Sequence, residues 1–150
     1  MEGVSAPRDP GVSLVGLVAL VVAVAAMAID HLVGTDRTDD EGLVDPAMFA
    51  ISVGLSLAVA AFLFGWLVPR ETSRGPERAA RSGLVCSVAS VIPGIAFLWV
   101  GFPFVVAGAG LALGLEGRGS GRHFESRAAM AIGGLVLVLG AAAYVVAAVS

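Results

Sequence analysis

The sequence has little charge, a single cysteine and no lysine. Charged residues make up 14% of its 150 residues and apolar residues 57%, whereas soluble domains carry about 25% charged residues. A chain of this composition is expected to form one integral membrane domain over residues 1–150, without a nucleic-acid partner. The lone Cys86 excludes an intramolecular disulfide and leaves the redox compartment open.

Charged side chains are absent from four long apolar runs, at residues 11–29, about 46–68, 82–115 and 128–149. The run 82–115 is too long for one upright span, because a straight helix of this length would measure about 50 Å, whereas the hydrocarbon core is about 30 Å thick. The segment must tilt steeply or fold back as a hairpin. Gly101 and Pro103, surrounded by aromatic residues, are typical of a turn at a membrane interface.

The distribution of arginine favours the hairpin, because short arginine-rich loops stay in the cytoplasm. One crossing over 82–115 puts five arginines inside and four outside, whereas a hairpin puts eight inside and one outside. We therefore predict an all-α polytopic transmembrane helix bundle with five spans, at about 11–33, 46–68, 77–99, 103–118 and 127–149. Four spans, with 82–115 as one long bent helix, remain the alternative, because each hairpin arm has only about 13 to 17 apolar residues, at or below the usual minimum for a span.

This threading assigns each polar segment to one side of a cell membrane. Residues 1–10 form a cytoplasmic tail, 34–45 an acidic external loop, and 70–81 and 116–127 two arginine-rich cytoplasmic loops. The N-terminus is then cytoplasmic and the C-terminus outside. Trp66 falls at the inner interface, and Trp99 and Tyr144 fall near the outer one, where amphipathic aromatic rings are enriched.

The first apolar run has a second interpretation, a secretory signal peptide cleaved after about residue 28. Ala26-Met27-Ala28 resembles an A-x-A cleavage site. However, the apolar region exceeds the usual length of about 7–15 residues, and the leading segment carries one arginine against two acidic residues. We expect the run to be retained as a span, and cleavage of residues 1–28 stays open.

Two groups of residues could suggest a metal or proton site. Asp30 and His31 close the first apolar run, but there they border a polar loop and can reach water, unlike functional charges inside a membrane. The acidic loop offers no register with both the glycine and the final glutamate of an EF-hand. Its acidic residues are Asp36, Asp39, Asp40, Glu41 and Asp45. We predict no metal, cofactor or catalytic residue.

Arginine recurs in the loop between the second and third spans, at Arg70, Arg74, Arg78 and Arg81. Four guanidinium groups beside two spans could hold anionic lipid head groups. The simpler interpretation is a cytoplasmic loop without lipid specificity, and both stay open.

Small residues form stripes on two of the spans. On the second span they are Ala50, Gly54, Ala58, Ala61 and Gly65, and this stripe predicts a buried face where another helix approaches closely. Ser87 and Ser90 share a face with Gly83 and Gly94, and Cys86 beside them is interpreted as a small buried side chain. Gly110 and Gly114 form a G-x-x-x-G packing pattern. A dinucleotide-binding loop is not expected here, because no strand precedes the glycines.

The second half of the chain resembles a known type of protein. An arginine-ended loop leads to GLVCSVASVIPGIAFLWVGFPFVVAGAGLALG, then to the basic EGRGSGRHFESR and to AAMAIGGLVLVLG. Over residues 80–145 this is similar to small Gly-rich multi-span membrane proteins of a domain-of-unknown-function type common in actinobacteria. The resemblance implies an apolar hairpin, an arginine-rich turn and a final helix. It implies no activity.

The leading functional hypothesis is a non-enzymatic structural or accessory protein whose partners are the lipid bilayer and other membrane helices, including its own copies. A small transporter or channel component is the alternative. It would have to use serines such as Ser52 and Ser56, because the spans lack a mid-membrane Asp, Glu, Lys, Arg or His. An intramembrane hydrolase is less favoured, because neither Ser87 nor Cys86 has a histidine in the same span.

Overall fold

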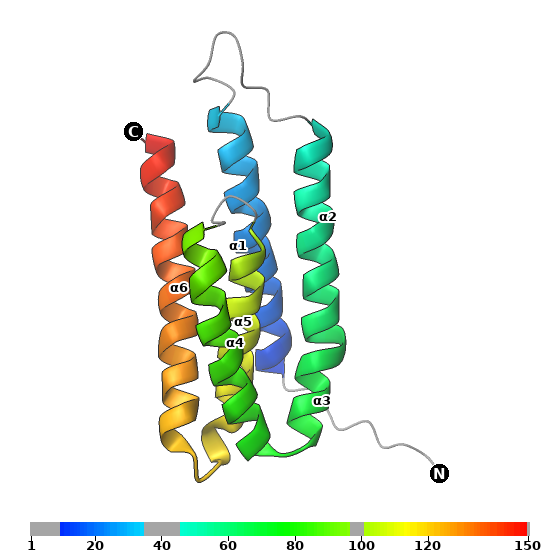
Figure 1. Cartoon of the computed structure of the whole chain (residues 1–150), viewed down its shortest axis with the longest axis vertical. Coiled ribbons are helices and arrows are strands. Elements are labelled where there is room, and N and C mark those ends of the chain that lie inside the picture. Colours follow the sequence, from blue (N-terminus) through cyan, green and yellow to red (C-terminus); the bar gives the residue numbers. More distant parts are fainter. Residues whose placement is uncertain (1–9, 35–45, 97–100, 150) are drawn as a thin grey trace, which may run out of the picture.

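The computed structural model describes residues 10–34, 46–96 and 101–149, and within these ranges the chain forms five helical rods and no strand (Figure 1). Four of the rods are α1 (Pro10–Gly34), α4 (Pro76–Ala96), α5 (Phe102–Glu116) and α6 (His123–Val149). The remaining rod is continuous through α2 (Pro46–Phe62), η1 (Leu63–Leu67) and α3 (Val68–Ser73). A single 3-10 turn, η3 (Gly117–Gly119), follows α5.

Proline and glycine set the helix boundaries. α1, α2 and α4 each begin with a proline, whose missing N–H costs no hydrogen bond in the first turn. Gly75 and Gly101 are the glycines with positive φ, +107° and +75°, a conformation that side chains with a Cβ rarely adopt. Gly75 separates α3 from α4, and Gly101 caps the start of α5.

The charge-free middle third of the chain folds back on itself, as the arginine distribution predicted. α4 and α5 lie antiparallel, with Gly83 beside Gly114 and Ala80 beside Gly117. The alternative of one long bent helix over 82–115 is therefore wrong. α4 ends at Ala96, and Gly101, with its left-handed backbone, is the N-cap from which α5 starts in the opposite direction.

A π-helical turn interrupts the second rod. In η1 the Val68 N–H donates to the Leu63 carbonyl, five residues earlier. Pro69 follows immediately and can neither donate a hydrogen bond nor accept close contact with the carbonyl four residues before it. The wider turn gives the proline ring room, so the rod continues to Ser73 without a break.

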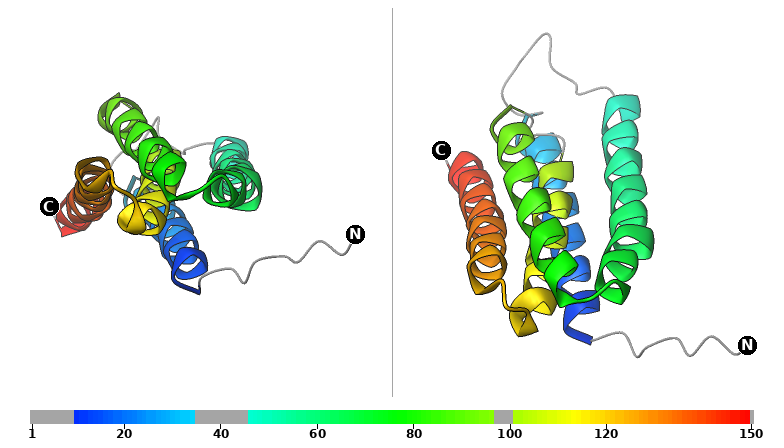
Figure 2. Two further views of the ribbon diagram at one scale, coloured as in Figure 1. Left: turned by 90° about the horizontal axis from the view of Figure 1, so that it is seen from below. Right: turned by 60° about the horizontal axis from the view of Figure 1, so that its bottom comes forward.

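The rods alternate in direction, and α5 lies at the centre of the bundle (Figure 2). α5 contacts α1, α2, α3, α4 and α6. The described ends of the chain lie at opposite ends of the bundle, whereas the α3–α4 and α5–α6 connections lie at the same end (Figure 1). Both predicted arginine-rich loops therefore share one end. The acidic loop and the N-terminal tail lie largely outside the described residues.

The helices occur where the five spans were predicted, within a few residues at each boundary. Two stretches of the described residues are long and apolar enough to cross a membrane, Phe49–Ser73 and His123–Ala143, and Leu14–Ile29 is a shorter apolar helix. Only 17% and 22% of the most apolar windows of the two long stretches are buried. Most residues of these two windows are therefore not buried inside the bundle.

Candidate functional site

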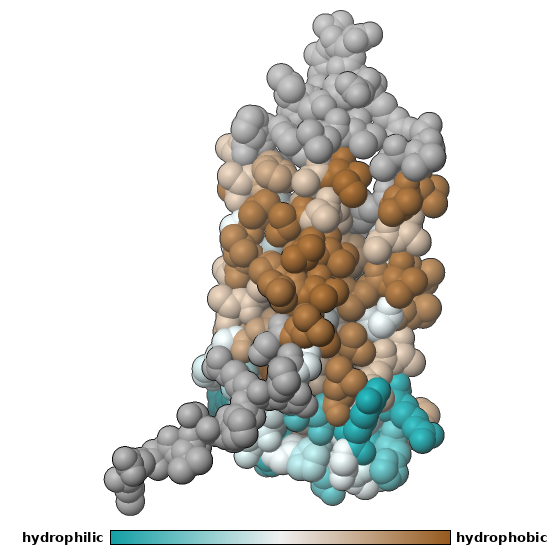
Figure 3. All heavy atoms as spheres, turned by 180° about the vertical axis from the view of Figure 1, so that it is seen from behind, coloured by the Kyte–Doolittle hydropathy of each residue, from teal (hydrophilic) through white to brown (hydrophobic). Residues whose placement is uncertain are grey.

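Large apolar side chains lie on the outside of the bundle. We call this surface the apolar belt. Its residues include Leu14, Leu17 and Val21 on α1, Ile51, Leu55 and Phe62 on α2, Val85, Val88 and Ile92 on α4, and Leu135, Val138 and Val146 on α6. On the face in Figure 3 hydrophobic residues cover the middle of the molecule, and hydrophilic residues gather at one end.

The interior, in contrast, consists mainly of small residues. Ala19, Ala23, Ala107, Ala109 and Ala112 are completely buried. The serines Ser56, Ser87, Ser90 and Ser126 are also buried. Water-soluble folds have the opposite arrangement, with large apolar side chains inside. Small residues let helix backbones approach closely, which is the main source of packing energy between helices in lipid.

Serine hydroxyls join α4, α5 and α6 through backbone carbonyls. Ser87 on α4 donates to the Ala129 carbonyl on α6 at 2.8 Å, and Ser126 on α6 donates to the Gly114 carbonyl on α5 at 2.7 Å. Each buried hydroxyl therefore has an acceptor, which offsets its loss of water. The Ser87 hydroxyl is thus used in a contact between α4 and α6.

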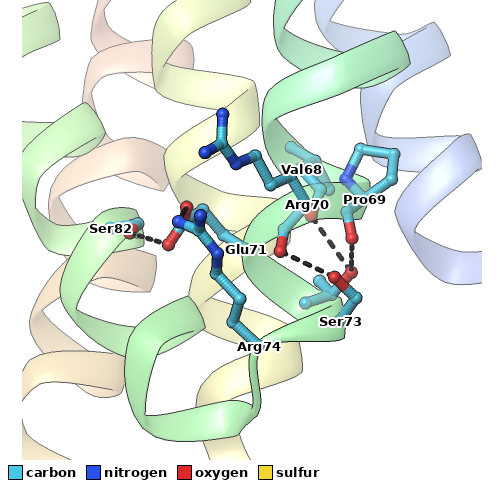
Figure 4. A network of polar contacts seen from close by, with 8 residues as sticks. Val68, Pro69, Arg70, Glu71, Ser73, Arg74 and Ser82 are labelled. Atoms are coloured by element: carbon cyan, nitrogen blue, oxygen red, sulfur yellow. Dashed lines mark hydrogen bonds and ion pairs between the residues drawn. The ribbon is translucent and has the colours of Figure 1, made fainter.

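Arginines gather at the end of the bundle where α3 turns into α4. We call Arg70, Glu71, Arg74 and Ser82 the α3–α4 corner. Glu71 joins the two helices, because one carboxylate oxygen lies 2.8 Å from Arg74 and the other accepts from the Ser82 hydroxyl at 3.0 Å. Figure 4 shows Glu71 between these partners. The Arg74 charge is thus neutralised within the protein.

Arg70 has a different environment. Its guanidinium lies 4.6 Å from the centre of the Trp66 ring, and Trp66 in turn stacks on Phe62 at 5.1 Å. A cation over an indole face is attracted by the ring quadrupole. Among the described residues Arg70 makes no ion pair with a carboxylate. Trp66 therefore orients the Arg70 guanidinium, and the positive charge can still pair with an anion.

A second basic corner lies where η3 leads into α6. Arg122 pairs with Glu125 at 2.6 Å, and the Ser120 hydroxyl donates to the Gly117 carbonyl at 2.7 Å. Arg118 lies against the Met130 sulfur, with Nε at 3.1 Å. Residues 70–127 hold seven arginines and four glutamates, so this stretch of the chain carries a net charge of +3.

The stripe of small residues predicted to form the buried face of the second span is exposed. All five positions face away from the bundle, namely Ala50, Gly54, Ala58, Ala61 and Gly65. A Cβ added at Gly54 or Gly65 would meet nothing within 4 Å. The face that packs instead carries Ser56, Ala60 and Leu63. The prediction was wrong because α2 contacts α1 and α5 through a different face, which also carries small residues, while most of its large side chains are exposed.

The other residues singled out from the sequence are scattered. Arg78, Arg81 and His123 are exposed, and Cys86 is half-buried where full burial was expected. Ser56 lies inside, with its hydroxyl 4.0 Å from the Met27 sulfur. Asp30 and His31 lie in the last turns of α1, and their side chains are outside the described part. No group of three His, Cys, Asp or Glu in that part could hold a metal.

Several contacts escaped the sequence analysis. Arg70 and Trp66 are four residues apart, the spacing that places two side chains on one helix face, so this pair could have been found. The pairing of Glu71 with Ser82 and of Ser126 with Gly114 had no sequence signal, because each depends on how separate helices pack.

Comparison with known proteins leaves the geometry as the guide to function. No family model, curated protein or solved structure matches this chain.

Proposed function

We propose that this chain is a five-span protein of the cell membrane with a structural or accessory role and no enzymatic activity. One observation carries the proposal: the apolar belt surrounds a core of alanine, glycine and serine. Exposed to water, such a belt would lose the favourable free energy of burying apolar area. In a bilayer the same side chains meet acyl chains, and the small residues inside supply the helix packing.

The positive-inside rule orients the bundle with its arginine-rich end in the cytoplasm. The N-terminus is then cytoplasmic and the C-terminus outside. In this proposal α1 is retained and not removed as a signal peptide, because Ala19, Ala23, Ala26 and Met27 on α1 are buried in the bundle. Removing them would uncover α5, which packs on α1.

The shortness of the fourth span is compatible with a membrane position. α5 has 15 residues, about 22 Å of helix, which is less than the hydrocarbon thickness of about 30 Å. Ten of its residues are buried. Since the surrounding helices separate α5 from lipid, its length need not match the bilayer.

The contents of the spans favour an accessory role over transport. Ion-coupled transporters place ionisable side chains at mid-membrane depth. In the described parts of the spans, Arg and Glu occur only at the arginine-rich end, whereas Asp30 and His31 lie in the last turns of α1 at the opposite end. The middle of the spans holds none of these residue types. The buried serines Ser87 and Ser126 are committed to backbone carbonyls between helices.

Membrane extraction of the full chain tests the proposal. We expect the protein to stay in the membrane pellet through alkaline carbonate and high salt and to be released only by detergent, because the apolar belt must be covered. Release by carbonate would contradict membrane integration. Purified protein in liposomes should leave potassium and proton gradients intact, and gradient collapse that depends on the protein would instead establish a channel or transporter.

A further inference from the structure

Arg70 in α3 and Arg74, the residue that caps the end of α3, carry the same charge but have different contacts. Arg74 is paired with Glu71 at 2.8 Å, and Ser82 fixes the other oxygen of that carboxylate at 3.0 Å. Arg70 faces an uncharged indole ring at 4.6 Å and has no carboxylate partner among the described residues. One cation is therefore already neutralised, and the other is oriented and open to an anion.

The rings next to Arg70 are themselves exposed. Trp66 is 48% exposed and Phe62 is 55% exposed, and both belong to the rod that carries the apolar belt toward α3. A ligand bound at Arg70 would thus place an anionic group at the guanidinium and an apolar chain along the two rings. Indole rings prefer this boundary between head groups and acyl chains.

On α4, too, exposed arginines at the polar end of the bundle are followed along the helix by exposed apolar side chains. Arg78 and Arg81 are exposed and are followed on the same helical face by Val85, Val88 and Ile92, at spacings of three and four residues. Both helices of the corner therefore present arginine at the polar end and bare hydrocarbon-facing side chains beyond it. Such a surface matches a lipid with an acidic head group, whose head would meet the arginines and whose acyl chains would meet the apolar side chains.

We infer that the α3–α4 corner binds the head group of an anionic phospholipid, with Arg70 as the phosphate contact and Trp66 as the residue that positions it. The inference rests on the proposed membrane location of the chain. A guanidinium presents parallel N–H donors that match two phosphate oxygens, and its stacking on Trp66 leaves the edge with those donors free. The acyl chains lie along Trp66 and Phe62, so the ligand is a lipid and not free phosphate.

Fluorescence of Trp66 in reconstituted vesicles tests this site. Trp99→Phe leaves Trp66 as the one tryptophan, since the chain has two. The protein is placed in vesicles containing phosphatidylglycerol or phosphatidylcholine with the same brominated acyl chains, which quench tryptophan on contact. We expect phosphatidylglycerol to occupy the site roughly fivefold more strongly than phosphatidylcholine, the effect of about one basic residue near an acidic lipid.

Arg70→Gln and Arg74→Gln form the matched pair, because each removes one positive charge, the first from α3 and the second from the residue that caps it. The preference for phosphatidylglycerol should fall to about onefold in Arg70→Gln and stay near its original value in Arg74→Gln. Equal losses in the two variants would overturn the inference and leave only diffuse attraction to a basic surface. Inorganic phosphate added to the vesicles should not compete, and full competition would overturn the lipid assignment.

The same measurement separates this inference from the proposed function. If both brominated lipids quench Trp66 equally in the unsubstituted corner, the chain lies in the bilayer and the head-group site is refuted. If neither lipid quenches Trp66, the membrane location itself is wrong.

Discussion

Glycine and serine occupy the positions where α4, α5 and α6 approach most closely. A Cβ at Gly110 would lie 2.8 Å from the Ser87 nitrogen and 3.0 Å from the Gly83 carbonyl oxygen. At Gly133 it would lie 2.8 Å from the Ala107 carbonyl oxygen. These contacts are with backbone atoms, which cannot move aside as flexible side chains do. The three helices can therefore meet at this distance only with hydrogen at these positions.

Gly110→Val should destabilise the bundle by about 2 kcal/mol or more, the cost of forcing extra volume into a packed interior. The matched control is Gly134→Val on α6, where an added Cβ meets nothing within 4 Å. Thermal unfolding of the purified protein in detergent measures the difference. A melting temperature equally lowered in both variants would mean that helix propensity, and not the α4–α5 contact, sets the effect.

At the scale of single elements, the second rod contains a π-helical turn between an apolar segment and a charged one. The π-helical turn over Leu63–Leu67 accommodates Pro69 and lies between the apolar α2 and the charged α3. Trp66 belongs to this turn, and Arg70 follows in α3. The rod therefore passes from exposed apolar side chains to charged side chains without a break in the helix.

The outward face of α2 gives a prediction for the element. Gly54→Ala should leave the fold intact and raise the free energy of unfolding by up to about 1 kcal/mol, because glycine inside a helix is less favourable than alanine by that amount. The added methyl group meets open space. Thermal unfolding in detergent measures this, with Gly83→Ala as the contrasting variant, where the Cβ would lie 2.8 Å from the Gly114 nitrogen. A loss of stability in Gly54→Ala would show that this face is packed in the native protein.

At the scale of the whole molecule, the shortest of the five rods, α5, lies at the centre and the longer rods surround it. α5 lies in contact with all of its neighbours and buries nearly its whole surface. Its lack of an amphipathic pattern follows from this, since every side faces protein. The odd number of rods leaves the two ends of the chain at opposite ends of the bundle and brings both arginine-rich connections together.

The threading predicts the behaviour of topology reporters in cells. A reporter that is active only outside should be active when fused after Ser150 and silent when inserted at Gly121. In the five-span threading the last span lies between these two sites and places them on opposite sides of the membrane. A reporter active only in the cytoplasm should give the reverse pattern and serves as the control. Activity of the external reporter at Gly121 would place the second basic corner outside and contradict the proposed orientation.

Much of the fold could be predicted from local sequence. The charge-free runs located the helices, and the length of 82–115 together with the arginine count predicted the hairpin that Gly101 makes possible. These features are set by composition, backbone conformation and charge, each of which acts within a short stretch of chain. The grouping of both arginine-rich connections at one end followed from the same counting.

What the sequence could not decide is which face of each helix is buried. The small-residue stripe of α2 faces outward, whereas similar residues on α4, α5 and α6 form the tightest contacts. Likewise, the spacing of Glu71 to Arg74 and of Trp66 to Arg70 is local, but only the packing of α3 against α4 brings the Ser82 hydroxyl to the other oxygen of Glu71. The physical reason is that in a helix apolar on all sides no periodicity marks an inner face, so the choice depends on the shapes of the neighbouring helices.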